Sequence, residues 1–113
     1  MHELSLCRSL IKLLQQQAEQ QGFSRVCAIW LDVGPIAGVV PEALEFAFSA
    51  CSPGTLAEGA TLHMVPSQAT ARCRDCGQIS NPSSRLDPCP HCGHAAVDLI
   101  SGDNLTIKEL EVE

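Results

Sequence analysis

The chain has 113 residues, of which 45% are hydrophobic, and its seven Lys and Arg against thirteen Asp and Glu give a formal net charge of −6. This length allows one ordinary core or two small lobes, and this hydrophobic content indicates a packed protein rather than a disordered one. The negative charge argues against a nucleic-acid partner, because phosphate binding needs a basic surface. No apolar run approaches the ~20 residues that a membrane-spanning helix requires.

The first segment, residues 3–21, is expected to form an amphipathic helix that ends before Gly22, a residue suited to the position after a C-cap. Apolar residues recur at helical spacing and define one buried face, and charged and amide side chains occupy the other face. We expect the apolar row to belong to the core. The row consists of Leu4, Cys7, Ile11, Leu14 and Ala18, widened by Leu6, Leu10 and Leu13.

A strand is expected over residues 25–33, where a nearly unbroken apolar run is typical of a central strand covered on both faces. Gly34 ends this run, and a second helix begins at Pro41, whose fixed φ suits the first helical position. That helix ends near Ser52, and a second strand follows at about residues 60–66.

The last segment, residues 105–112, reads as a strand whose alternation slips before Leu110. We expect it to pair with the sheet of the first lobe. The predicted fold is therefore α+β: residues 1–66 and the final strand, 103–113, form a small sheet with two helices, and residues 67–102 are inserted as a zinc-ribbon-like lobe.

Two Cys-x-x-Cys-Gly motifs are the strongest chemical signal in the chain. Twelve residues separate them, enough for one motif to fold back over the other and bring four thiolates to the corners of a tetrahedron, as in structural Zn²⁺ sites. A glycine after each second cysteine permits a positive φ that turns backbone N–H groups toward the sulfurs. The proposed zinc ligands are Cys73, Cys76, Cys89 and Cys92, followed by Gly77 and Gly93.

Other uses of these cysteines compete with zinc. Two disulfides would leave Cys7, Cys27 and Cys51 as an odd set, and no export signal precedes the chain, so we expect a cytoplasmic protein with reduced thiols. Iron in a rubredoxin-like site uses the same four ligands and stays open. Residues 67–98 are poor in large apolar side chains, which indicates that the metal supplies folding energy to this lobe.

The first three residues, Met1, His2 and Glu3, form a second potential metal site. A terminal amine, backbone amide nitrogens and an imidazole nitrogen can close fused chelate rings with in-plane donors, which suits the square-planar preference of Ni²⁺ or Cu²⁺ better than tetrahedral Zn²⁺. The alternative is that His2 is simply a solvated residue near a chain end.

These features together resemble the HypA/HybF family of nickel-incorporation proteins in NiFe-hydrogenase maturation. The resemblance rests on the start Met-His-Glu-Leu-Ser-Leu-Cys, on Trp-Leu-x-x-Gly at residues 30–34, on the Cys-Pro-His-Cys motif and on Gly-Asp-Asn-Leu-Thr-Ile near the C-terminus. It covers essentially the whole chain.

The resemblance implies a nickel metallochaperone rather than an enzyme. It implies that Ni²⁺ binds at the N-terminal Met-His-Glu with His2 as principal ligand and Glu3 nearby. The candidates for a further donor are the Met1 amine, a backbone nitrogen and water. The four cysteines would hold structural zinc. The implied partners are a HypB-type GTPase and the NiFe-hydrogenase large subunit. Relatives in some organisms also serve urease, which makes urease maturation proteins further candidates. The negative charge and the lack of a long apolar run predict neither a nucleic-acid nor a membrane partner.

One departure from the family pattern concerns the second helix. Relatives usually carry a carboxylate six residues after the glycine that ends the first strand, and this chain has Val40 there, with Glu42 as the nearest acid. We therefore do not assign that carboxylate as a ligand. His91 and His94 border the second cysteine motif and are candidates for tuning the zinc site, whereas His63 is expected to be structural.

Two other functional classes remain at this point. A zinc-ribbon adaptor in a protein assembly would bind zinc alone, and a thiol redox protein would show a reversible dithiol couple. No nucleophile–base pair and no glycine-rich phosphate loop is apparent in the sequence, so no catalysis is expected.

Overall fold

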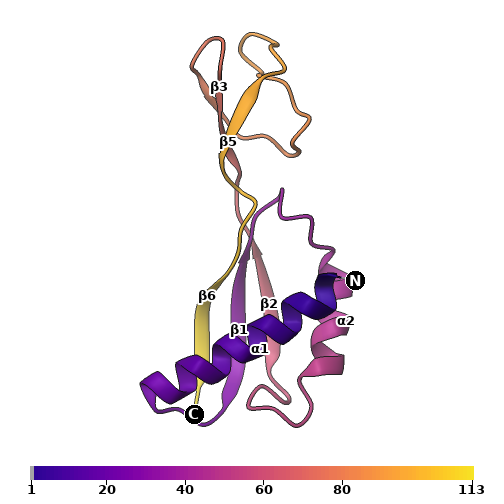
Figure 1. The fold of residues 1–113 in the computed structure, drawn as a ribbon, viewed down its shortest axis with the longest axis vertical. Helices are drawn as coiled ribbons and strands as arrows, with labels where there is room; N and C mark the ends of the chain where they lie inside the picture. Colours follow the sequence, from indigo (N-terminus) through magenta and orange to yellow (C-terminus); the bar gives the residue numbers. More distant parts are fainter. Residues whose placement is uncertain (1) are drawn as a thin grey trace. The chain divides into compact units, whose positions relative to one another are not determined.

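The computed structural model describes residues 2–113 and has an α+β fold with two helices and two three-stranded sheets (Figure 1). The α+β prediction is therefore confirmed. No helix in this part of the chain has the length and apolar character needed to cross a membrane. The elements are α1 (His2–Gln21), β1 (Val26–Val33), α2 (Pro41–Cys51), β2 (Thr61–Pro66), β3 (Thr70–Cys73), β4 (Ile79–Ser80), β5 (Val97–Ser101) and β6 (Leu105–Val112).

The chain divides into two compact units. The first contains both helices and most of the β2-β1-β6 sheet, and the second contains the β4-β3-β5 sheet. The first unit comprises residues 1–31, 39–64 and 107–113, and the second comprises residues 32–38 and 65–106.

In the first unit, β1 is the central strand of the sheet, and β6 pairs with it as predicted. The core consists of the buried side chains of one α1 face together with those of β1 and α2. Leu13, at the margin of the predicted apolar row, is 43% exposed, because it lies beside rather than within the buried face. The other core side chains of this unit include Cys7, Ile11, Leu14, Ile29, Leu31, Leu44 and Phe48.

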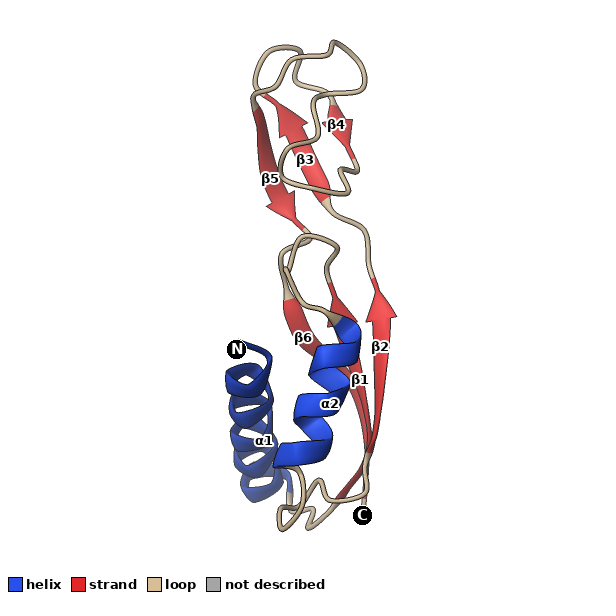
Figure 2. Cartoon of the chain, turned by 90° about the vertical axis from the view of Figure 1, so that its right-hand side faces the viewer, coloured by secondary structure: helices blue, strands red, loops and turns tan. Residues whose placement is uncertain are grey.

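The expectation that β1 is covered on both faces is confirmed: Val26 and Ala28, which share a face with Trp30, are buried, and so are Ile29 and Leu31 on the opposite face. Both helices lie on the same face of the sheet (Figure 2). Trp30 stacks on His63 of β2, with ring centroids 4.8 Å apart and planes 16° apart. Ile29 and Leu31 alternate with Trp30 along the strand and are fully buried, so the helices cover their face and the Trp30–His63 pair occupies the other.

In the second unit, β3 pairs antiparallel with both β4 and β5. The sequence pattern predicts no strands in this cysteine-rich segment, because its strands are only two to five residues long and too short to show a period. Its buried side chains are small: Ala69, Ala71, Cys73 and Cys89. This sheet ends at the cysteine motifs, because Cys73 is the last residue of β3.

Candidate metal centres

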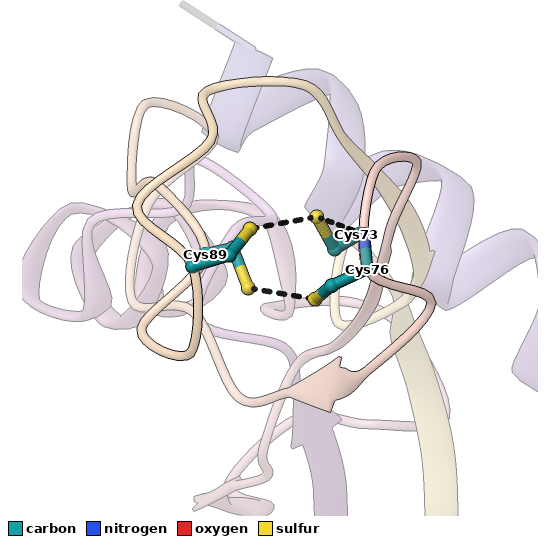
Figure 3. A group of neighbouring side chains, drawn as sticks. Cys73, Cys76 and Cys89 are labelled. Carbon is teal, nitrogen blue, oxygen red and sulfur yellow. Dashed lines mark hydrogen bonds between the residues drawn. The ribbon is translucent and has the colours of Figure 1, made fainter.

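The four cysteines of the two Cys-x-x-Cys motifs converge in the second unit, with Cys73 and Cys76 on one side and Cys89 facing them (Figure 3). Their sulfur atoms all lie within 4.8 Å of one another; Cys73 Sγ is 3.6 Å from Cys92 Sγ, and Cys76 Sγ is 3.7 Å from Cys89 Sγ. A tetrahedral zinc ion with Zn–S bonds of ~2.3 Å places its sulfurs about 3.8 Å apart. The cluster therefore fits zinc.

All seven cysteines of the chain are free thiols. The alternative of two disulfides among the four motif cysteines is therefore wrong. The other three cysteines do not belong to the four-sulfur cluster. Cys7 is fully buried, whereas Cys27 and Cys51 are partly exposed.

The two cysteine motifs have the same backbone geometry. In each, the N–H of the first cysteine donates to the carbonyl five residues later, and the glycine N–H donates back to the carbonyl of the first cysteine, with N···O distances between 2.8 and 3.0 Å. The glycines have φ values of 76° and 77°, which confirms the predicted need for glycine at both positions. The residues are Cys73, Gly77 and Gln78 in the first motif and Cys89, Gly93 and His94 in the second.

The motif geometry also favours thiolates. The backbone N–H groups of Cys76 and Asp75 donate to Cys73 Sγ at 3.5 and 3.4 Å, and these hydrogen bonds lower the pKa of Cys73 to about 6. Cys92 accepts a hydrogen bond from the His94 N–H, which favours its thiolate, but burial and the neighbouring sulfurs outweigh it and raise the pKa of Cys92 to about 12. Four adjacent thiols do not all ionise by themselves, because the negative charges of neighbouring thiolates repel one another. A bound divalent cation offsets this repulsion and allows all four to be thiolates.

An ion pair that sequence reasoning missed joins the first motif to β5. Arg74 donates from Nε and Nη2 to Asp98 Oδ1 at 2.8 and 2.7 Å, and the Arg74 N–H donates to the Ala96 carbonyl. The hydrogen bond from Arg74 lowers the pKa of Asp98. Opposite charges 24 residues apart give no sign of pairing until β3 and β5 are known to be adjacent.

At the other candidate site, α1 begins at His2, and His2 Nε2 lies 3.5 Å from Glu3 Oε2. The His2 side chain is 56% exposed and that of Glu3 is 16% exposed. Within residues 2–113, no third His, Cys, Asp or Glu joins this pair to form a metal-binding group. The Met1 amine, the further donor expected from sequence, lies outside the described residues.

The two residues at and near the position of the unassigned carboxylate lie at the start of α2. Val40 is the N-cap residue of α2 and is 53% exposed, and it carries no ligand atom. Glu42 lies in the first turn of α2, is exposed, and belongs to no group of three ligands within the described part of the chain.

The remaining histidines have other contacts. His63 stacks on Trp30. The backbone N–H of His91 donates to Cys89 Sγ at 3.4 Å, and His94 Nδ1 accepts a hydrogen bond from the Ala96 N–H at 3.1 Å. Neither imidazole belongs to the four-sulfur cluster.

Comparison with known proteins gives one family for the whole chain. The protein-family model described as "HypA: Hydrogenase/urease nickel incorporation, metallochaperone" matches residues 1–112. Hydrogenase maturation factors HypA from Geotalea uraniireducens (strain Rf4) and Azotobacter chroococcum mcd 1 are 46% and 44% identical over 100% of both chains. The chain is also similar to the solution structure of the Ni metallochaperone HypA from Helicobacter pylori, with a TM-score of 0.73 and 20% identity over 97% of this chain and 96% of that one. At this identity the similarity supports the fold alone.

Proposed function

The chain belongs to the HypA family of nickel-incorporating metallochaperones for hydrogenase and urease, and on that premise we propose that it binds Ni²⁺ at its N-terminus and delivers it to the large subunit of a NiFe-hydrogenase. His2 is the principal ligand, Glu3 lies beside it, and the Met1 amine is a further donor. Cys73, Cys76, Cys89 and Cys92 hold structural zinc. Nickel delivery takes place in the cytoplasm and involves a HypB-type GTPase.

The observation that carries the nickel site is the start of α1 at His2. The first four N–H groups of an α-helix have no intrahelical acceptor, so the amide nitrogens of His2 and Glu3 are available without breaking helical hydrogen bonds. When deprotonated, these two nitrogens contribute two negative charges and offset the charge of Ni²⁺. This matters because the positive end of the helix dipole disfavours an uncompensated cation.

Release to an acceptor follows from the same position. The imidazole of His2 is more than half exposed, so an incoming ligand from a partner protein can reach the metal without unfolding the core. The ligands are consecutive along the backbone, and they can therefore leave one after another as the acceptor's ligands arrive.

The four-cysteine cluster supports the separate, structural role of zinc. Protein ligands would fill all four positions of the tetrahedron, and a closed site of this kind leaves no position for transfer chemistry. The small side chains buried in the second unit also leave most of its folding energy to the metal. We propose on these grounds that residues 67–102 act as a zinc lobe inserted between residues 1–66 and 103–113.

Nickel titration of the untagged, zinc-loaded protein tests the proposal. We expect one nickel per chain with the visible absorption of a square-planar ion. We expect His2→Ala to lower the nickel affinity by at least about tenfold, because substituting even a residue that only hydrogen-bonds a metal ligand lowers metal affinity by that much. His63→Ala is the matched control, because it removes an imidazole from the first unit away from the chain start.

Transfer is measured separately, by following radiolabelled nickel from the loaded protein to purified hydrogenase large subunit with and without the GTPase. Unchanged nickel binding in His2→Ala would contradict the proposed site. Tight nickel binding without transfer to the large subunit would contradict only the proposed delivery and would leave the nickel site intact. A chain that bound zinc and no nickel would instead be a zinc-ribbon adaptor.

A further inference from the structure

A groove of about 440 Å³ in the first unit lies between α2, the loop that follows it and the beginning of β2. Its apolar lining includes Phe48, which is buried, Leu62, which is half-buried, and Pro53. Two carboxylates, Glu45 from α2 and Glu58 from the loop, also line it and are exposed. The groove therefore combines an apolar surface with acidic side chains.

The charges of this groove are not balanced within the chain. Glu58 Oε1 accepts a hydrogen bond from the Gly54 N–H at 2.9 Å, which orients its carboxylate. Across residues 2–113, neither Glu45 nor Glu58 forms an ion pair. A basic group stands nearby: Arg25 Nη2 lies 3.8 Å from the position of a Cβ on Gly59, which also lines the groove. With Glu42 on the same helix, three acidic side chains outnumber this one guanidinium.

Phe46 is 77% exposed and does not itself line the groove, but it precedes the lining residue Ser49 by three positions, and residues three apart are neighbours on a helix surface. It follows Glu45 in α2, and the hydroxyl of Ser49, a lining residue one turn on, donates to the Phe46 carbonyl at 2.7 Å. The other phenylalanine and tryptophan side chains, by contrast, are buried or half-buried. Leaving a phenylalanine in water forgoes roughly 2 kcal/mol of burial, and phenylalanine is among the residues enriched in protein–protein interfaces.

We propose that the α2 groove, defined as the groove lined by Glu45, Phe48, Glu58 and Leu62 together with Phe46, binds a segment of a partner protein that presents Lys or Arg beside an apolar side chain. The apolar side chain packs against Phe46 and Leu62, and the cation pairs with Glu45 and Glu58. This interaction surface needs no metal ligand and is additional to the proposed nickel function.

Charge selects this occupant over the others. A second copy of the chain would set the same acidic groove against itself, and each copy has a formal net charge of −6. Anionic lipid and nucleic acid would be repelled by the same carboxylates. A basic, apolar protein segment is attracted by the groove and also covers Phe46.

The test uses the full-length, zinc-loaded, ¹⁵N-labelled protein and an array of short peptides that combine Leu or Phe with Lys or Arg at neighbouring and helical spacings. Each peptide has a twin in which Glu replaces every basic residue. The strongest binder is then titrated while amide shifts are recorded. We expect the shifts to concentrate in residues 42–62, and the affinity to fall as the salt concentration rises.

Four variants make the test specific. Phe46→Ala and Glu45→Lys are expected to weaken peptide binding by about tenfold or more, as substitutions of central contact residues do. The matched controls are Leu86→Ala, which removes an apolar side chain that is 91% exposed in the second unit, and Glu111→Lys, which reverses an exposed charge on β6; both should keep the wild-type affinity.

The proposal is wrong if no basic peptide binds better than its glutamate twin, or if the shifts lie outside residues 42–62. It is also wrong if Phe46→Ala binds the peptide as the wild type does, or if this substitution abolishes a concentration-dependent dimer, since a second copy would then be the occupant. Nickel titration of the same variants reports on the His2 site separately, so each proposal can fail alone.

Discussion

Gly34, directly after β1, packs against Gly102 so closely that no side chain fits between them. A Cβ on Gly34 would overlap the Gly102 carbonyl group. Two hydrogen bonds hold the segments together: the Gly34 N–H donates to the Asn104 carbonyl at 2.9 Å, and the Ile36 N–H donates to the Gly102 carbonyl at 2.8 Å. The obstructing atoms belong to the backbone, so rotamer changes cannot relieve the overlap.

Gly34→Ala is therefore expected to destabilise the protein by about 2–3 kcal/mol, as insertion of atoms into a tightly packed site does. The measurement is urea denaturation of the zinc-loaded protein followed by far-UV circular dichroism. Gly54→Ala is the control: its φ of +80° disfavours a side chain, but nothing lies within 4 Å of the added Cβ, so it should cost only about 1 kcal/mol. Equal losses in the two variants would show that close packing at Gly34 is unimportant.

Cys92→Ser is expected to remove zinc and to unfold the second unit, because the side chains buried there are small and the metal supplies about 10 kcal/mol in sites of this kind. Metal analysis and limited proteolysis check this: cleavage should appear within residues 67–102 while the α-helical circular dichroism persists. Cys27→Ser, which alters a cysteine outside the cluster, should keep its zinc and resist cleavage. Retention of zinc by Cys92→Ser would show that the fourth sulfur is dispensable.

Cys7 gives a pH dependence in the alkaline range. Burial raises the pKa of this thiol from 9.0 to about 11, with further contributions from Cys51 and Glu3, and its Sγ donates to the Leu44 carbonyl at 3.5 Å. The unfolded chain loses the proton first. Stability from the protonated thiol is therefore fully present below pH 9.0 and is lost as the pH rises toward about 11.

Urea denaturation at a series of alkaline pH values checks this expectation. Cys7→Ala should begin less stable, because it leaves a small cavity, but its stability should fall less steeply with pH than that of the wild type. Parallel curves for the two proteins would show that the titration of Cys7 does not contribute.

Glu42→Gln is expected to leave nickel affinity within about threefold of the wild type, since Glu42 is exposed and belongs to no metal-binding group among the described residues. Calorimetric titration with Ni²⁺ measures this, with His2→Ala as the comparison. A loss as large as that of His2→Ala would make Glu42 a ligand and would restore the family's usual carboxylate two residues later in the chain.

Local sequence chemistry predicted the elements that depend on it. The helical periodicity before Gly22 and the fixed φ of Pro41 located α1 and α2 to within a residue or two, and glycines 77 and 93 have the positive φ expected of them. The strands β3 and β5 were missed, because four or five residues beside cysteines and prolines show little periodicity.

The apolar run of β1 predicted burial on both of its faces correctly, but it did not predict what covers each face. An apolar run records burial without recording what buries it. On one face the helices cover Ile29 and Leu31, and on the other a histidine ring stacks on Trp30, and a single sequence does not distinguish these two kinds of cover.

Sequence alone determined the ligand types of this protein, because thiolates at a repeated spacing and an imidazole beside a chain start have metal preferences that do not depend on the fold. Only the tertiary structure decided the rest. Pairing β3 with β5 lets Arg74 meet Asp98, the loop before β5 brings four sulfurs within 4.8 Å, and the loop after α2 places Glu58 in the same groove as Glu45. Contacts between residues far apart in the chain depend on how the elements pack, and local patterns carry no record of that packing.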